Sequence, residues 1–339
     1  MLRPVNLCGM GAVCWMRING VFQGGGVRGI SLVGAVRAAE IHGFTFDKLA
    51  GTSSGSIVAS LLASGYQAEE MKELILETNF TKFLKRAFIF NTPLVGPAVR
   101  IMLKKGLYAG EALEDWLRKV LLAKGIRTFK DIEPGKLSII ASDITSGKIL
   151  ILPNDLNKLG INEEYFEVAR AVRMSCSIPY FFDPVLLRLP PKLSRSKAFK
   201  DQFLHIVDGG LLSNMPLWLF DQDGVKPNGG RGKITPTVGF QMVGKNSGKP
   251  HRIGGPFSML QALFDTMLSA HDERYIEQAN RYRTIKVPIL GIGVTQFNIT
   301  HEESLLLHES GFRAGSKFFG DWSTQYYEEE FTKYFQQAF

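Results

Sequence analysis

Short apolar runs alternate with longer stretches of helical spacing along the first third of the chain. The run at residues 18–23 predicts a buried strand, and apolar side chains recurring through residues 27–41 predict a helix. A second strand over residues 44–50 and a second helix from Ser54 onward repeat this order. A layered α/β fold with a parallel sheet typically shows this succession of strand, glycine-rich loop, helix, strand, tight turn and helix.

The remainder of the chain continues both kinds of segment. Helical spacing recurs at residues 68–78, 109–122, 167–174 and 302–319. Short apolar runs typical of strands recur at residues 137–141, 150–152, 203–207 and 238–242. Since no internal repeat or long linker divides the chain, we expect residues 16–339 to form one domain, with a motif-bearing core at 18–220. Residues 1–15 contain a broken apolar stretch without a signal-peptide cleavage site, and we interpret them as an extension that is disordered or not physiological.

Composition narrows the class of protein without identifying it. The 339 residues are 45% hydrophobic and 21% charged, as expected for a globular protein, and no apolar run approaches the ~20 residues that span a bilayer. A formal net charge of +8 favours polyanionic partners or serves only solubility. The basic loops lack the aromatic interleaving of nucleic-acid binders, so we expect no nucleic-acid partner. Three cysteines without a C-x-x-C pair argue against a disulfide framework or a zinc site and favour a cytoplasmic setting.

The sequence Gly51-Thr52-Ser53-Ser54-Gly55 lies between a predicted strand and a predicted helix. A G-x-S-x-G motif in that context exposes a nucleophilic serine on a strained turn, and its glycines avoid collisions with neighbouring backbone. The following helix directs free N–H groups and its positive dipole end toward the same place. Ser53 is therefore a candidate nucleophile, and the alternative is a serine that only caps the helix.

A second glycine-rich loop, with the sequence GGGVRG, joins the first strand to its helix. Consecutive glycines allow backbone N–H groups to turn toward an anion without obstruction by a Cβ atom. In an acyl-transfer enzyme Gly24, Gly25 and Gly26 would form an oxyanion hole, worth roughly 3–4 kcal/mol per well-placed donor. Arg28 would support this loop, add positive potential or form a structural salt bridge, and Gly29 completes the motif.

The same loop also satisfies the G-x-G-x-x-G fingerprint of dinucleotide-binding proteins. That interpretation requires an acidic residue at the end of the second strand, about 20 residues further on. Asp47 lies at nearly that distance but within its strand, and the residues after the strand form the serine motif. A hydrolase explains both glycine motifs, whereas a dinucleotide-dependent oxidoreductase explains one.

A serine hydroxyl becomes a good nucleophile when a neighbouring base accepts its proton. None of the six histidines occurs in a recognisable catalytic motif. His205 precedes Asp208 by three positions on one predicted strand, so the two side chains point to opposite faces. Asp208 stands at the end of that strand, before Gly209 and Gly210, and strand ends line the crevice of α/β sheets. We therefore expect Asp208 to be the base, the alternative being an aspartate that initiates a turn.

At these motifs the chain resembles the patatin-like phospholipase family. Residues 175–185 (SCSIPYFFDPV) and 214–216 (NMP) add to the resemblance. It implies a three-layer α/β/α fold of patatin type with a central, mainly parallel sheet. It also implies lipid acyl hydrolysis through an acyl-enzyme, without a metal or organic cofactor. Carried over by position, the resemblance implies that Ser53 and Asp208 form the catalytic dyad and that the GGGVRG loop supplies the oxyanion donors.

Residues 81–105 interleave apolar side chains with Lys and Arg. This pattern fits a surface segment that dips into an anionic headgroup layer, although a lid or helix packed on the core would explain it as well. We therefore expect a lipid or ester substrate, and a cytoplasmic protein with a peripheral position at the membrane. A non-catalytic lipid-binding protein is the alternative to an enzyme.

Overall fold

The computed structural model describes residues 15–84, 95–196, 198–221, 235–244, 253–255 and 280–337, together with residues 259, 262, 263 and 266 and the backbone of 7–8 and 12–13. Most of the expected N-terminal extension and part of the basic segment 81–105 thus lie outside the described residues. Among the described helices, none combines the length and apolar character that a bilayer crossing requires.

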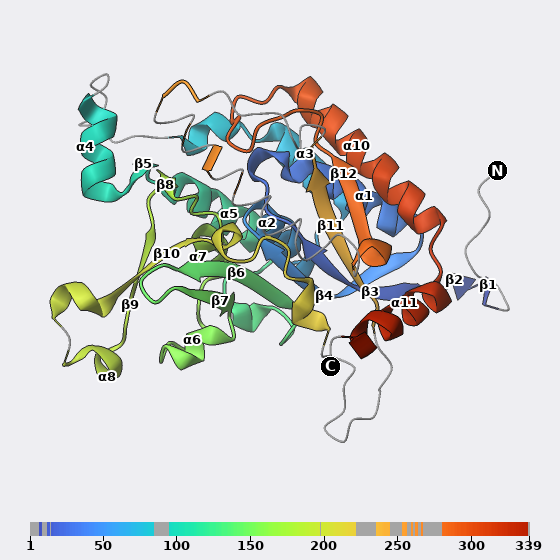
Figure 1. Cartoon of the computed structure of the whole chain (residues 1–339), viewed down its shortest axis with the longest axis horizontal. Coiled ribbons are helices and arrows are strands. Elements are labelled where there is room, and N and C mark those ends of the chain that lie inside the picture. Colours follow the sequence, from blue (N-terminus) through green and yellow to red (C-terminus); the bar gives the residue numbers. More distant parts are fainter. Residues whose placement is uncertain are drawn as a thin grey trace.

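An eight-stranded mixed sheet forms the centre of the fold (Figure 1). Its strands follow the order β12-β11-β3-β4-β6-β10-β9, and β7 pairs with β6. They are β3 (Met16–Phe22), β4 (Phe44–Thr52), β6 (Leu137–Asp143), β7 (Lys148–Leu152), β9 (Val185–Arg188), β10 (Phe203–Asp208), β11 (Thr237–Val243) and β12 (Thr284–Pro288). From β12 to β6 neighbouring strands are parallel, whereas β7, β10 and β9 pair antiparallel. The expected α/β class is confirmed, and the sheet has a parallel half and an antiparallel half.

Helices lie on both sides of this sheet (Figure 1). They are α1 (Ile30–Ile41), α2 (Ser54–Ala63), α3 (Ala68–Glu77), α4 (Val95–Lys104), α5 (Glu111–Ala123), α6 (Asp155–Lys158), α7 (Val168–Ser175), α8 (Pro191–Ser194), α10 (His301–Gly320) and α11 (Thr324–Gln337). Phe22 and Val21 are adjacent on β3, so they point to opposite faces and pack in separate apolar clusters. Phe22 belongs to the large core that contains α1 and α2, and Val21 packs with the short 3₁₀ turn η7 (Leu217–Phe220).

Helix α1 is buried on almost its whole circumference because it packs against the sheet, α3 and α10. Gly34 permits the close approach of α10, since a Cβ atom there would collide with the backbone carbonyl of His308. The first strand, its glycine-rich loop and α1 are therefore held in place by a fully packed layer.

Most predicted segments occur as predicted, with ends shifted by a few residues. The patterns did not predict β12, β9 or α11, nor β5 (Gly106–Tyr108) and β8 (Tyr180–Phe182), which pair in parallel outside the main sheet. Strands of three to five residues are too short to display a two-residue period, and β5 and β8 depend on each other for pairing.

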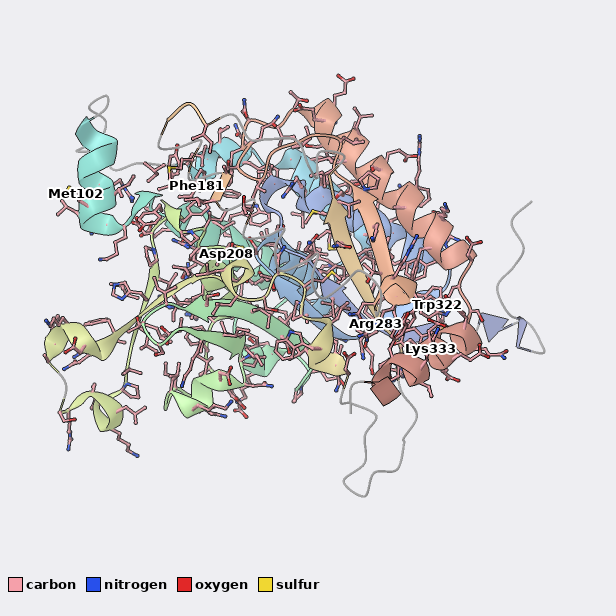
Figure 2. The ribbon with its side chains drawn as sticks, viewed as in Figure 1. Met102, Phe181, Asp208, Arg283, Trp322 and Lys333 are labelled. Atoms are coloured by element: carbon pink, nitrogen blue, oxygen red, sulfur yellow. The ribbon has the colours of Figure 1, made fainter. Side chains whose placement is uncertain are left out.

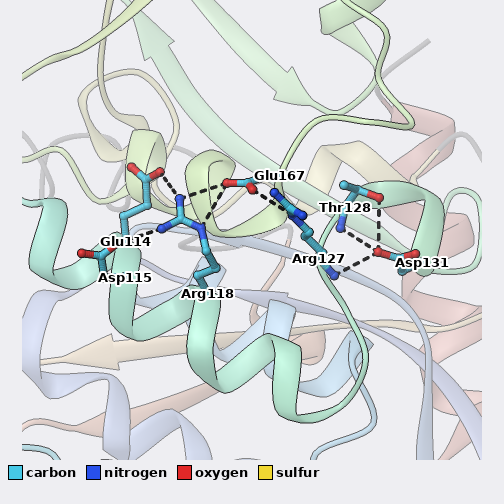
Figure 3. Close-up of polar contacts among 7 residues, drawn as sticks. All are labelled: Glu114, Asp115, Arg118, Arg127, Thr128, Asp131 and Glu167. Atoms are coloured by element: carbon cyan, nitrogen blue, oxygen red, sulfur yellow. Dashed lines mark hydrogen bonds and ion pairs between the residues drawn. The ribbon is translucent and has the colours of Figure 1, made fainter.

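A charged network joins α5 to the start of α7 (Figure 3). Arg118 of α5 donates to Glu167 at 3.0 Å and to Glu114 at 2.9 Å, and Arg127 donates to Glu167 at 3.1 Å. Glu167 is the N-cap residue of α7. Burial raises the pKa of Glu167, but the hydrogen bonds from Arg118 and Arg127 outweigh it and leave that pKa lowered. The network therefore stabilises a carboxylate at the beginning of α7, where the helix dipole also favours it.

Candidate active site

Ser53 occupies a sharp turn between β4 and α2. Its backbone adopts φ 53° and ψ −127°, a strained conformation for a residue with a side chain. A Cβ atom at Gly51 would collide with the backbone of Gly55, and one at Gly55 with the carbonyl of Phe22. The turn therefore requires glycine at both positions, as the motif predicts.

The hydroxyl of Ser53 does not cap α2. Ser53 is the N-cap residue, but its side chain makes no capping hydrogen bond within the described structure. The neighbouring serines are engaged elsewhere: Ser54 Oγ accepts the Gly25 N–H at 3.0 Å, and Ser56 Oγ donates to the Ser53 carbonyl at 2.6 Å. The alternative of a purely capping serine is therefore not supported by these contacts.

Asp208 ends β10 and is completely buried, deep inside the molecule (Figure 2). Oδ1 accepts the Gly210 N–H at 2.8 Å, so the expected turn-forming contact is present. Oδ2 is buried without a hydrogen-bond partner among the described residues. Burial raises the pKa of Asp208 to about 7, although the adjacent Ser53 hydroxyl and the Gly210 N–H act to lower it. The Ser53 hydroxyl thus lies beside the carboxyl group, in a contact that lacks the geometry of a regular hydrogen bond.

The sheet register brings these two residues together across β6. Thr52 of β4 pairs with Ile140 of β6, and Asp208 of β10 pairs with Ala141, the next residue of the same strand. A Cβ atom at Gly209 would collide with the Ile140 carbonyl, so the chain after Asp208 also passes close to β6. Because β10 is antiparallel to β6, Asp208 reaches Ser53 through this register and not through a common carboxyl edge of parallel strands.

The glycine-rich loop lies beside the turn, but two of its three expected donors are engaged. The Gly24 N–H donates to the Asn214 carbonyl at 3.3 Å, and the Gly25 N–H donates to Ser54 Oγ. The Gly26 N–H makes no hydrogen bond to another described residue. Arg28 supports the loop, because its Nε donates to the Gly25 carbonyl at 2.9 Å. Of the three expected oxyanion donors, the Gly26 N–H is therefore the one without a hydrogen bond to another described residue.

A small cavity of about 60 Å³ opens over Ser53. Its walls are almost wholly apolar and include Phe80, Phe83, Leu113, Ile178, Phe182 and Phe297, with Gly26, Ser53, Ser54 and Cys176 also contributing. Among the residues that the structure describes, no histidine lines it. His205 on β10 instead has a pKa that is lowered by burial and by Lys105. Ser53 therefore lies in the wall of an apolar hollow, and the Asp208 carboxyl lies beside Ser53 without lining the hollow itself.

Sequence reasoning assigned no role to two residues that contact the site. Ser175 Oγ accepts the Ser53 N–H at 2.8 Å. Asn214 accepts the Gly24 N–H through its carbonyl, and its Nδ2 donates to the Gly24 carbonyl at 3.4 Å. Both residues fall in stretches that carry the family resemblance, which was the one signal that could have indicated them.

Comparisons with known proteins agree with this architecture. The family model described as patatin-like phospholipase matches residues 20–221. Protein YqhO of Bacillus subtilis (strain 168) is 40% identical over 309 residues, which are 91% of this chain and 100% of YqhO. A protein of Invertebrate iridescent virus 6 named "Probable lipid hydrolase 463L" is 27% identical over 206 residues, which are 58% of this chain and 61% of the viral protein.

Among solved structures, VipD from Legionella pneumophila aligns with a TM-score of 0.50 and 16% sequence identity. The alignment covers 89% of this chain and 66% of VipD, so the chain spans about two thirds of that protein's length. At this level of identity the likeness concerns the fold alone.

Proposed function

The chain belongs to the patatin-like phospholipase family, and we propose that it is a lipid acyl hydrolase with Ser53 as nucleophile and Asp208 as base. The family and the similarity to a probable lipid hydrolase support lipid hydrolysis as the class of activity. The observation that carries this proposal is the buried Asp208 carboxyl beside the strained Ser53 turn. Its pKa is raised to about 7, and its Oδ2 has no hydrogen-bond partner among the described residues. A general base is most effective when its pKa lies near the working pH.

In the first half of the proposed reaction, Ser53 Oγ attacks the ester carbonyl carbon while its proton passes to Asp208. The tetrahedral intermediate then collapses and breaks the bond to the leaving alcohol. Asp208 returns the proton to that alcohol, and an acyl group remains esterified to Ser53. In the second half, Asp208 accepts a proton from water as the water attacks the acyl-enzyme. Asp208 then returns that proton to Ser53 Oγ as the bond between Oγ and the acyl carbon breaks, so the fatty acid leaves and Ser53 is regenerated. No step requires a metal or an organic cofactor.

The negative charge of the intermediate needs hydrogen-bond donors. We assign this role to the GGGVRG loop, in which the Gly26 N–H donates to no other described residue and the Gly25 N–H becomes available when the Ser54 hydroxyl turns away. Gly24 would support the loop through its paired contacts with Asn214 rather than donate. The N-terminal N–H groups of α2 add positive potential at the same place.

The apolar cavity suits an acyl chain, but its present volume holds only a few water molecules. Phe83 separates it from a wider groove of about 640 Å³ that runs along α3 and α5 and includes Trp116. We propose that a chain enters by displacing Phe83, so that the cavity and the groove become continuous.

We further propose that α4 contacts anionic membrane. Met102 and Leu103 are 83% and 65% exposed, and the exposed Lys104 and Lys105 follow them; Figure 2 shows Met102 pointing outward from this peripheral helix. Apolar side chains beside Lys residues fit a headgroup layer. Replacing Met102 and Leu103 with serine should reduce sedimentation with phosphatidylserine vesicles and leave hydrolysis of a soluble ester unchanged. Equal sedimentation of variant and wild type would contradict this contact.

We also propose that residues 16–339 act as one domain. Strands β11 and β12 lie beyond residues 20–221, yet β11 pairs directly with β3 in the central sheet. Helix α10 packs on α1, which follows the glycine-rich loop.

Reaction with a fluorophosphonate probe tests the catalytic proposal, because such a probe phosphonylates an activated serine with loss of fluoride. We expect a single adduct on Ser53 by peptide mapping, absent from Ser53→Ala and strongly slowed in Asp208→Asn. A folded wild-type protein that gains no adduct, with or without anionic vesicles, would favour the non-catalytic lipid-binding alternative.

A further inference from the structure

Ser53 directly follows β4 and Asp208 ends β10, and these two strands are not neighbours in the sheet. β4 and β10 lie on either side of β6, so no β-ladder hydrogen bond joins their strands directly. A proton can pass between the two side chains only when their separation is held closely. The distance between the Ser53 hydroxyl and the Asp208 carboxyl therefore depends on a segment of the chain that contacts both residues.

The C-terminal end of α7 contacts the nucleophile. Ser175 is completely buried, and its Oγ accepts the Ser53 N–H at 2.8 Å and donates to the Ile140 carbonyl at 2.5 Å. Strained backbone such as that of Ser53 persists only when its surroundings hold it. The single hydroxyl thus ties the strained turn to β6.

Two residues further on, the same segment contacts the base. The Ser177 carbonyl accepts the Asp208 N–H at 2.9 Å. The Ser177 hydroxyl donates to the Arg173 carbonyl at 2.7 Å and accepts from the guanidinium of the same arginine. Arg173 in turn donates to the carbonyls of Ala109 at 2.8 Å and Asp183 at 2.9 Å. The segment is therefore anchored on the side of the base as well.

Helix α7 is fixed at its other end by the charged network around Glu167 (Figure 3). Between the two contacts lies Cys176, which is buried, faces the cavity and contacts Ser56 Oγ through its sulfur at 4.0 Å. The end of α7 is thus a short, rigid connection from the nucleophile turn to the end of β10.

Resting on the Ser–Asp mechanism proposed above, we propose that Ser175 is a positioning residue whose hydroxyl holds Ser53 in register with Asp208. It acts through the Ser53 backbone and β6, and touches neither the carboxylate nor the ester. Without the hydroxyl, the Ser53 N–H and the Ile140 carbonyl each lose a buried partner, and the turn is free to relax. A displacement of about 1 Å in such a site lowers a rate by roughly 100-fold.

Ser175→Ala tests this role against Ser60→Ala as matched control. Ser60 is equally buried, and its hydroxyl donates to the Ser56 carbonyl at 2.6 Å within α2 without contact to Ser53. With a soluble short-chain p-nitrophenyl ester, we expect Ser175→Ala to lower kcat by about 10–100-fold and to change KM by less than about threefold. The rate of fluorophosphonate labelling at Ser53 should fall in parallel, while Ser60→Ala stays close to wild type in both measurements.

A kcat and a labelling rate that fall no further in Ser175→Ala than in Ser60→Ala would overturn the proposal. If Ser175→Ala does not fold, Ser175→Cys tests the proposal in its place. A thiol nearly preserves the side-chain volume but forms much weaker hydrogen bonds than a hydroxyl. A folded Ser175→Cys with wild-type kcat would equally overturn it. Failure of the catalytic proposal is a separate result, in which the wild-type protein itself is not labelled.

Discussion

Ser53 and Asp208 lie on opposite sides of β6, and their surroundings differ in kind. The Ser53 region stores strain in the backbone: φ is positive, and two glycines of the same five-residue motif make room for the turn. The Asp208 region has an ordinary extended backbone (φ −52°, ψ 134°), but its carboxyl is buried with one oxygen unpaired. Close backbone packing thus sets up the Ser53 region, and exclusion of water sets up the Asp208 region. We expect substitutions in the two regions to differ accordingly.

Removal of the nucleophile should have the largest effect. Ser53→Ala eliminates the attacking oxygen, and we expect ester hydrolysis to fall by at least about 10⁴-fold. Circular dichroism should remain like that of the wild type. Ser60→Ala, which removes an equally buried hydroxyl in α2, should stay within a fewfold of wild-type activity. Residual hydrolysis by Ser53→Ala within tenfold of wild type would assign the nucleophile elsewhere.

Neutralisation of the base should have the next largest effect. Asp208→Asn preserves shape but cannot accept the Ser53 proton, so we expect kcat to fall by about 10³–10⁴-fold. Asp143→Asn is the matched control, because Asp143 is also buried on the neighbouring strand but accepts the N–H groups of Thr145 at 2.9 Å and Ser146 at 3.3 Å. Similar losses of kcat in both variants would indicate a general structural effect instead of a lost base.

The pH dependence should follow the Asp208 carboxyl. The base functions only when unprotonated, and burial raises the pKa of Asp208 to about 7. We therefore expect kcat/KM for a soluble ester to rise about tenfold per pH unit below 7 and to level off above it. Initial rates between pH 5 and 9 measure this profile. A profile that is flat across this range would show that the rate does not depend on this group.

The smallest expected effect is on stability, and it should differ in sign between the two aspartates. The folded pKa of Asp208, about 7, lies above the ordinary value of 3.8. Stability from this group is therefore fully present below about pH 4 and is lost as the pH rises through about 7. Asp208→Asn cannot ionise, so we expect it to be more stable than wild type by about 1–2 kcal/mol at pH 8 and to show no such gain at pH 4.

Asp143→Asn should instead lose about 1–2 kcal/mol at pH 8, because it weakens charge-assisted hydrogen bonds to two backbone N–H groups. Thermal unfolding at both pH values measures the two variants together. Destabilisation of both at pH 8 would contradict the description of Asp208 as a carboxyl whose ionisation is disfavoured by burial.

Much of the fold was predictable because strong periodic segments form elements wherever they pack. The runs at residues 137–141 and 150–152 became the antiparallel pair β6 and β7. The segments at 44–50 and from Ser54 onward became β4 and α2. Short elements such as β5 and β8 were missed because each exists only by pairing with the other.

Asp208 was selected for its place at a strand end, yet β10 runs antiparallel to β6. Asp208 lies beside Ser53 because the pairing register of β10 with β6 brings it there. Strand direction is a property of the assembled sheet, since a single strand pattern is the same in both directions.

The amino-acid sequence by itself determined one steric condition of the Ser53 turn, because a Cβ atom at Gly51 would collide with Gly55, four positions along the chain. The second condition is tertiary, because a Cβ atom at Gly55 would collide with the Phe22 carbonyl of the neighbouring strand β3. Only the tertiary structure decided which N–H groups of the glycine-rich loop are open, how far the pKa of Asp208 rises and what supports the strained turn. Ser175 contacts Ser53 across 122 positions, and Asn214 contacts Gly24 across 190. Such contacts, and the exclusion of water that they create, arise from packing of distant segments, which no local pattern encodes.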